Sequence, residues 1–399
     1  MFLTERIVSL LTYALALMVI YYLIGNVARK QYKAVLLFYV LILAIFAFNY
    51  KPYITADLYR LREYVEYWIH KDWTGVVKYA LKSTTPSWVL YSYIISKLGN
   101  TNWLQTVTCL WCFGNVFYII AHEIERHNVE GKYRSELLFY IMAVGAFYLQ
   151  TISGIRSMLG ISIVAFCLYR ETVEKKSIAA HLPLWLFAAL IHTSTMVLVI
   201  SRFLFLLVQS QGVVKKILMS VVVFVLAIFS YKYLGGYISG SFEYGQSYLH
   251  STKEYTYIWE IIIGLLETFE TLYILFKYRK KCVKSDNGIV ESGFKDLYYF
   301  TLIWTSVSII SLPFSYTVFR RYTMLCTVTS MPLVAFLLGT AVDELERKRT
   351  RNILFALSFL IFALSGVRGD LCGYKFFCNW MIDHLGYKTT DALRGLWRK

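Results

Sequence analysis

The sequence is poor in charged residues, which argues against an ordinary soluble protein. Only 17% of its 399 residues are charged, whereas 57% are hydrophobic and the mean hydropathy is +0.51. A soluble chain of this length usually forms two or more domains and exposes more charge. The hydrophobic residues occur in runs of roughly 15–20, which as helices cross the hydrocarbon core of a bilayer. The sequence therefore predicts an all-α, multi-spanning integral membrane protein.

The sequence also lacks the motifs of several enzyme classes. It has no Walker loop, no dinucleotide-binding glycine pattern, and no HExxH or GxSxG motif. An Asp-x-Asp pair, which marks metal-dependent nucleotide-sugar enzymes, is missing too. The seven cysteines do not have a metal-binding spacing, and Cys109 and Cys112 lie in a hydrophobic run where thiols act as small apolar side chains. We therefore expect neither a metal nor a cofactor.

Acidic residues are scarce relative to basic ones. There are 25 Asp and Glu against 41 Lys and Arg, a net charge of +16. Basic chains often bind nucleic acid, but here the basic residues are spread over short connections between hydrophobic runs. That distribution is typical of the positive-inside rule. We expect the lipid bilayer, and no nucleic acid, as a partner.

The two ends of the chain carry different signals. The first hydrophobic run has no basic segment before it and no small-residue cleavage site, so it is interpreted as a transmembrane helix rather than a cleaved leader. Near the other end, Cys372 and Cys378 can form a disulfide if the tail faces an oxidising compartment.

About twelve hydrophobic segments are candidate membrane spans, and together they make residues 1–399 a single transmembrane domain. Several are only about 15 residues long, so we expect some to tilt, break or extend beyond these limits. The candidates are residues 7–25, 33–50, 102–121, 135–152, 155–170, 178–192, 193–209, 217–233, 257–276, 297–313, 322–341 and 353–367.

The orientation depends on the short segment 86–98. As a helix it spans only about 20 Å, less than the hydrocarbon core, so we interpret it as a re-entrant or interfacial helix on the outer face. The basic connections then share one side, which the positive-inside rule assigns to the cytoplasm. The outer side receives a large loop, residues 51–101, and a C-terminal tail, residues 368–399.

Two groups of polar residues fall on the outer side after short hydrophobic runs. Asp57, Tyr59 and Arg60 form the first group. Arg156 forms the second; it follows a Ser-Gly pair that allows a helix break, and is therefore expected in the first turn of the outgoing helix. Free N–H groups and the helix dipole attract anions there, and a guanidinium adds to that attraction. This arrangement is suited to a diphosphate.

Two further polar features lie on the same side. His192, between two hydrophobic runs, can act as a general base or donate a hydrogen bond to a developing phosphate charge. Arg320 and Arg321 are expected to head a helix at the outer face, in a short outer turn and against the positive-inside trend, where they suit a diphosphate-bearing lipid.

Each feature also has a plain structural interpretation. Asp57 can cap the following helix, and Arg156 can extend to lipid headgroups. His192 can be a hydrogen-bonded packing residue, and the arginine pair can anchor a helix end. The shared face of the four features, rather than any one of them, favours a site.

The residues around Arg156 and His192 resemble a known family. The stretch 154–200, GIRSMLGISIVAFCLYRETVEKKSIAAHLPLWLFAALIHTSTMVLVI, is similar to the core of the EpsG/Wzy-type polysaccharide polymerases. In that core a Gly-Ile-Arg turn opens a helix, and a later helix ends in a histidine followed by small polar residues. The resemblance extends over residues 30–200 and, more loosely, 300–340.

The chain departs from the family pattern at three points. YITADLYR replaces the Gly-x-Asp that often precedes the family's tyrosine, which weakens the assignment of Asp57. Ser157 follows Gly-Ile-Arg where glutamine is usual. The family's C-terminal arginine matches either Arg320 or Arg321.

The resemblance implies a GT-C-like glycosyltransferase of the bacterial inner membrane, with its active site facing the periplasm or exterior. In the implied reaction, a hydroxyl of the acceptor attacks the anomeric carbon of a glycan linked to undecaprenyl pyrophosphate, which leaves. The implied partners are the lipid-linked donor and acceptor glycans, a flippase and a chain-length regulator. The implied catalytic residues are Asp57, Arg156 and His192, with Asp57 or His192 as the base. The implied substrate-binding residues are Tyr59, Arg60, Arg320 and Arg321. Of all these, the arginines Arg156, Arg320 and Arg321 are implied to hold the diphosphate.

Other functions fit the pattern less well. A flippase or other transporter needs basic residues in a central cavity, and often internal repeats, whereas the polar residues here cluster at one face with Arg202 as the mid-span exception. A membrane O-acyltransferase predicts a His or Arg constellation on the inner side, which the pattern does not contain. A purely structural membrane protein does not require arginines in its outer turns.

Overall fold

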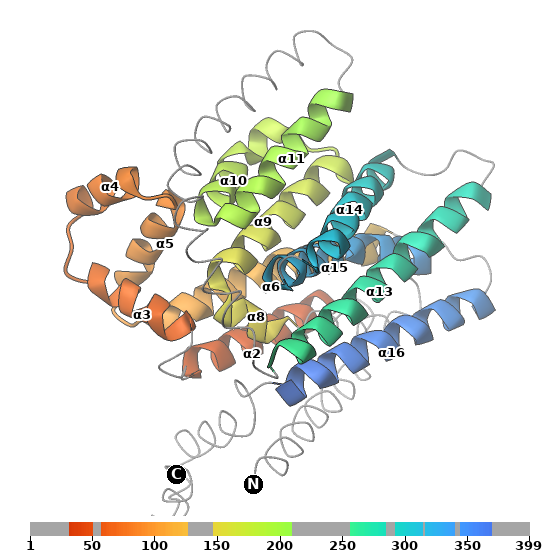
Figure 1. The fold of residues 1–399 in the computed structure, drawn as a ribbon, viewed down its shortest axis with the longest axis horizontal. Helices are drawn as coiled ribbons and strands as arrows, with labels where there is room; N and C mark the ends of the chain where they lie inside the picture. Colours follow the sequence, from red (N-terminus) through yellow and green to blue (C-terminus); the bar gives the residue numbers. More distant parts are fainter. Residues whose placement is uncertain are drawn as a thin grey trace, which may run out of the picture.

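The structure is a computed structural model, and every secondary-structure element in the part of the chain that it describes is a helix (Figure 1). The described residues are 32–50, 57–126, 147–209, 256–284, 292–313, 316–339 and 344–368. The thirteen helices are α2 (Tyr32–Asn49), α3 (Asp57–Trp68), α4 (Trp73–Lys82), α5 (Pro86–Ser96), α6 (Trp103–Arg126), α8 (Tyr148–Ser153), α9 (Ile155–Thr172), α10 (Ile178–Ile191), α11 (Thr193–Gln209), α13 (Thr256–Lys284), α14 (Ser292–Ser311), α15 (Tyr316–Gly339) and α16 (Glu344–Arg368).

Nine of the hydrophobic segments coincide with helices, which confirms the all-α class. The agreement is closest for α2, α9, α10 and α11, whose ends fall within two residues of the predicted limits. The expectations that lie outside the described residues are the segments 7–25 and 217–233, most of 135–152, the part 51–56 of the outer loop, and the tail beyond Arg368 with Cys372 and Cys378.

Several helices extend beyond the hydrophobic runs. α6 continues to Arg126, and α15 begins at Tyr316. Polar residues at a helix end lower the hydropathy without breaking the backbone hydrogen bonds, so hydropathy finds only the apolar middle of a helix. The prediction that Arg320 and Arg321 head a helix is confirmed, but the prediction that they lie in the turn before it is wrong, because both lie in the second turn of α15.

Two segments of the described chain are long and apolar enough to cross a membrane. They are α6, Trp103–Arg126, and the part Phe319–Gly339 of α15; α2, α10 and α11 contain shorter apolar stretches. In α15, 94% of the most apolar window is buried within the protein. α15 is thus the central helix of the bundle.

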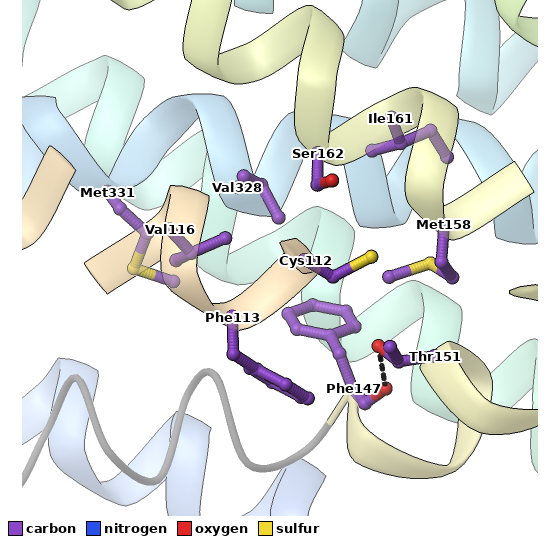
Figure 2. Close-up of a pocket in the computed structure, with 10 residues that line it drawn as sticks. All are labelled: Cys112, Phe113, Val116, Phe147, Thr151, Met158, Ile161, Ser162, Val328 and Met331. Atoms are coloured by element: carbon purple, nitrogen blue, oxygen red, sulfur yellow. Dashed lines mark hydrogen bonds between the residues drawn. The ribbon is translucent and has the colours of Figure 1, made fainter. Parts of the chain in front are cut away.

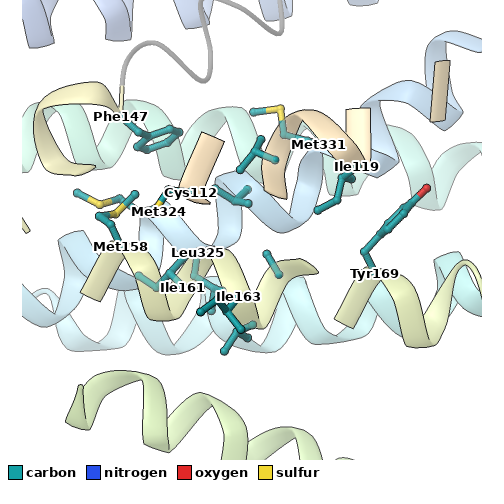
Figure 3. Close-up of a cluster of buried hydrophobic side chains, with 14 of the residues drawn as sticks. Cys112, Ile119, Phe147, Met158, Ile161, Ile163, Tyr169, Met324, Leu325 and Met331 are labelled. Carbon is teal, nitrogen blue, oxygen red and sulfur yellow. The ribbon is translucent and has the colours of Figure 1, made fainter. Parts of the chain in front are cut away.

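The core of the bundle forms where α6, α9, α13 and α14 pack around α15. For helices in a bilayer, where lipid is as apolar as a side chain, such close van der Waals packing provides the association. The three short helices α3, α4 and α5 pack on one another at one side of the bundle, where α5 also contacts α10 (Figure 1). Figure 3 shows part of the core, with Met324, Leu325 and Met331 of α15 beside Cys112 and Ile119 of α6 and Met158, Ile161, Ile163 and Tyr169 of α9.

A small void lies inside this core (Figure 2). Its walls are almost entirely apolar and include Cys112, Phe147, Met158 and Val328. Its volume is about 20 Å³, close to the space that a single water molecule needs. Neither a sugar nor a diphosphate fits in a void of this size.

Close packing of α9 against α11 depends on Gly160. A Cβ atom built on Gly160 would lie 2.5 Å from Cγ2 of Thr195, a distance that real Cβ contacts do not show. Gly114 in α6 is a useful contrast, because no atom lies within 4 Å of a Cβ built there.

We therefore expect Gly160→Ala to lower the thermal stability of the purified protein, by about 1–3 kcal/mol as is usual for overpacked cores. Gly114→Ala is the control and should leave the melting temperature unchanged or raise it, since alanine favours helix. Both variants are compared by thermal unfolding in detergent. Equal melting temperatures for the two variants would show that α9 and α11 are not in close contact at Gly160.

Candidate functional site

Arg156 lies in the first turn of α9, directly after a break in the helical path. α8 ends at Ser153 and α9 begins at Ile155, and the intervening Gly154 has φ −97° and ψ 41°. The Gly154 N–H donates to the Gln150 carbonyl at 2.7 Å, and a Cβ on Gly154 would lie 3.0 Å from the same oxygen. The predicted break is thus confirmed. It places the half-buried guanidinium of Arg156 beside the free amides of a helix N-terminus.

Aromatic side chains from α3 and α5 face Arg156. Its guanidinium carbon lies 5.7 Å from the ring centroid of Trp88, within the range of a cation–π interaction. Trp88 is stacked on Tyr64, with 6.1 Å between centroids and 19° between planes. Burial raises the pKa of Tyr64, and the positive charge of Arg156 acts in the opposite direction, so the two side chains are close. Sequence reasoning missed both aromatic residues, because Tyr and Trp occur throughout the outer loop.

His192 is the single residue between α10 and α11, and it is buried. Its Nδ1 accepts a hydrogen bond from the Ser194 backbone N–H at 3.1 Å and lies 2.7 Å from the Ser194 hydroxyl. Because a backbone N–H can only donate, the neutral imidazole carries its proton on Nε2. Because Nε2 carries the proton, His192 can donate a hydrogen bond from this nitrogen but cannot accept a proton there as a base.

The structure brings His192 close to two arginines. Burial, and then the positive charges of Arg321 and Arg156, hold the pKa of His192 well below its ordinary value. The three side chains come from the connection between α10 and α11, the second turn of α15 and the first turn of α9, which are far apart in the sequence. They form one cationic cluster at one end of the bundle, which we call the arginine cluster.

Arg320 points away from the arginine cluster. It forms a buried ion pair with Glu267 of α13, and its Nη1 lies 3.4 Å from the Thr323 hydroxyl. Successive residues of a helix point about 100° apart, so pairing Arg320 with α13 leaves Arg321 on another face. Glu267 was missed by sequence reasoning, although an acidic residue inside a hydrophobic run requires a partner.

Asp57, Tyr59 and Arg60 occupy the first turn of α3. Asp57 pairs with Arg60, three residues further along, and both side chains are exposed. A carboxylate in the first turn interacts favourably with the helix dipole. The position of Asp57 is therefore consistent with the plain structural interpretation, in which it stabilises the start of α3. Tyr59 is half-buried, and Tyr64 rather than Tyr59 stacks on Trp88.

A half-buried arginine anchors α3 to the bundle. Arg62 donates to the Tyr50 carbonyl at 2.6 Å and to the Gln105 side-chain oxygen at 3.3 Å. Gln105 in turn donates to the Ala47 carbonyl at 2.9 Å. Burial lowers the pKa of Arg62 to about 10, which leaves it charged at neutral pH. These bonds hold α3, and with it Tyr64, in a fixed place.

A comparison with protein families decides the identity. A model of the EpsG family matches residues 59–370 of the 399-residue chain. The chain belongs to the EpsG family. The resemblance inferred from the residues around Arg156 is thereby confirmed, and family membership associates the protein with exopolysaccharide biosynthesis and a bacterial membrane. No curated protein and no solved structure matches the chain.

The arginine cluster lies within the part of this EpsG-family protein that the family model covers, whereas Asp57 precedes it by two residues. Arg202, the mid-span exception, also finds a partner. Its Nε lies 3.5 Å from a Glu171 carboxylate oxygen, and Trp185 donates to the other oxygen. A buried charge of this kind requires such a partner. The ion pair thus joins α11 to α9 in the interior of the bundle.

We expect Arg320→Met to destabilise the protein strongly, because Glu267 would remain buried without a partner, which typically costs about 3–5 kcal/mol. Arg321→Met, one residue further along the same helix, is the control and should cost much less. The double variant Arg320→Met with Glu267→Met should regain most of the loss. Folded yield and melting temperature in detergent measure all three, and equal losses for Arg320→Met and Arg321→Met would contradict the ion pair.

Proposed function

We propose that this EpsG-family protein is a polysaccharide polymerase that joins undecaprenyl-pyrophosphate-linked repeat units at the outer face of the bacterial inner membrane. The observation that supports this most is the arginine cluster, in which the positive charges of Arg156 and Arg321 both act on His192 at one end of the bundle. Its neighbours Tyr64 and Trp88 offer aromatic faces on which sugar rings can pack.

In the proposed reaction, a hydroxyl oxygen of the acceptor glycan bonds to the anomeric carbon of the donor. The bond from that carbon to the diphosphate oxygen breaks, and undecaprenyl pyrophosphate leaves with the electron pair. The hydroxyl proton passes to a base. Negative charge thus develops on the leaving diphosphate, and catalysis requires that this charge be stabilised.

Arg156 and Arg321 are proposed to bind the leaving diphosphate. Guanidinium groups pair with phosphate oxygens in a fixed fork, and the amides at the start of α9 add further donors. His192 is proposed to donate Nε2–H to the same group, since its Nδ1 already accepts from Ser194. Asp57 is then the candidate for the base, with Tyr59 and Arg60 beside it on α3 to contact the glycans.

The membrane arrangement is part of the proposal. We assign about twelve spans in a GT-C-like arrangement, with α3, α4 and α5 on the outer surface. α5 has only 11 residues, which gives a length of about 16 Å, about half of a hydrocarbon core. A flippase that delivers the repeat units and a chain-length regulator are the proposed partners.

Replacement of either arginine of the cluster tests the proposal. Arg156→Ala and Arg321→Ala, expressed in a strain that lacks the native gene, should leave single repeat units on the lipid and reduce polymer by about 100-fold or more, as the loss of a charge-stabilising donor does elsewhere. Arg349→Ala, an exposed arginine of α16, is the control. The readout is the length distribution of the glycan on gels, with membrane insertion checked for each variant.

Normal polymer from an inserted Arg156→Ala protein would refute the diphosphate role. Repeat units stranded on the cytoplasmic leaflet would instead indicate a flippase, because a polymerase acts only after the units have crossed.

The pH dependence follows from His192. Because its pKa is lowered, the imidazole stays neutral on acidification until well below about pH 6.5, the ordinary value. We therefore expect that protonation of His192 does not lower the polymerisation rate in proteoliposomes between pH 8 and 6.5. Any fall in rate caused by its protonation, the acid limb of the pH profile, should lie below pH 6.5. His192→Gln, which keeps an N–H donor and does not titrate, should retain part of the rate and lose that limb. An acid limb centred above pH 6.5 that disappears in His192→Gln would contradict the assignment.

A further inference from the structure

A second polar site lies at the opposite end of α9 from Arg156. Here the C-terminal ends of α6 and α9 enclose an open cavity of about 430 Å³, which we call the inner cavity. Its lining residues are His122, Glu125, Arg126, Val173, Glu174 and Lys176. α9 has 18 residues, so the inner cavity lies about 27 Å along this helix from the arginine cluster.

The imidazole in the wall of the inner cavity is held by a buried hydrogen-bond chain. Nδ1 of His122 lies 2.6 Å from the Tyr169 hydroxyl, which donates to the Glu123 carboxylate. Tyr169 has a single proton and gives it to Glu123, so Nδ1–H of His122 donates to Tyr169. Tyr169 and Glu123 are both fully buried. These hydrogen bonds hold the imidazole ring of His122 in one orientation, and Nε2 takes no part in them. Such an arrangement is typical of histidines that bind a ligand.

The carboxylates at the mouth are already paired. Glu125 lies 2.9 Å from the Lys33 ammonium. Glu174 lies 3.3 Å from Nε of Arg170 and accepts a hydrogen bond from Tyr118 at 2.9 Å. Their negative charge is therefore largely neutralised by groups behind or beside the mouth.

The basic side chains at the mouth are in surplus. Arg126 lies 3.6 Å from Glu123, and the exposed Lys176 has no ion pair within the described ranges. The wall and the groups that pair with it contain four basic side chains, Lys33, Arg126, Arg170 and Lys176, against the three carboxylates Glu123, Glu125 and Glu174.

The backbone next to Lys176 is strained. Lys175 has φ 58°, in the left-handed region that favours glycine. The turn is closed by the Lys176 N–H, which donates to the Arg170 carbonyl at 2.9 Å, as in the usual left-handed ending of a helix. A lysine is less stable than glycine in this conformation. Such strain often accompanies a functional position, and here it keeps a basic side chain at the rim.

We propose that the inner cavity binds a phosphate group, carried either by an anionic lipid headgroup or by a soluble phosphate compound. Arg126 offers a planar fork, Lys176 a compact charge and His122 a fixed ring, the combination that recognises phosphate oxygens. In the orientation proposed above, the inner cavity opens at the cytoplasmic side, where basic pockets between helices bind anionic headgroups. This site is independent of the polymerase reaction, because the two ends share no residue.

Two binding measurements on the purified full-length protein distinguish the sources. In nanodiscs, native mass spectrometry counts the phosphatidylglycerol molecules that remain bound, with phosphatidylcholine as the uncharged reference. In phosphatidylcholine alone, calorimetry with inorganic phosphate measures a soluble ligand. Lys176→Gln is the main variant because this side chain is exposed and should not affect folding. Lys348→Gln, an exposed lysine at the start of α16, is the matched control.

We expect Lys176→Gln to weaken binding about tenfold or more in one of the two arms, and Lys348→Gln to leave it unchanged. Tyr169→Phe, which removes the bond that orients His122 without changing charge, should weaken the same arm. Loss in the lipid arm identifies a headgroup, and loss in the phosphate arm identifies a soluble ligand. No binding in either arm, or equal binding by Lys176→Gln and the wild type, would overturn the proposal. Neither binding measurement depends on polymer formation, so its outcome is separate from that of the polymerase test.

Discussion

The buried ion pair between Arg320 and Glu267 fixes the orientation of the central helix α15. A charge inside a membrane bundle must find a partner, and Glu267 is the partner that α13 provides for Arg320. Because α15 is almost fully enclosed by its neighbours, its rotation sets the positions of the residues around it. With Arg320 held against α13, Arg321 lies near His192. The position of a surface residue thus depends on a contact in the interior.

The same requirement explains the other buried charges. Glu171 pairs with Arg202 between α9 and α11, and Glu123 accepts a hydrogen bond from Tyr169 between α6 and α9. Each of these contacts joins two helices across the bundle. Polar contacts of this kind specify which faces of the helices meet, which apolar packing alone does less well.

The break at Gly154 has a different effect. An uninterrupted helix would carry Arg156 into the middle of an apolar segment, where a charge is expensive. The break ends α8 at Ser153 and starts α9 at Ile155, one residue before Arg156, so the guanidinium lies at a helix start against Trp88. At the C-terminal end of α9 the backbone turns at Lys175, next to the inner cavity. One helix therefore carries polar groups at both ends and apolar packing between them.

The sequence by itself determined the helical class, the approximate position of nine helices, the break before Arg156 and the family. These follow from hydropathy, from the backbone freedom of a Ser-Gly pair and from a local pattern around Arg156 and His192, all of which are properties of short stretches. Only the tertiary structure decided which arginine of the pair 320 and 321 lies near His192, that Tyr64 and Trp88 face Arg156, and that Glu267 and Glu171 have partners. These depend on the rotation of each helix about its axis and on contacts between residues far apart in the chain. Hydropathy along the sequence does not contain that rotation, because it is set by the packing of all the helices together.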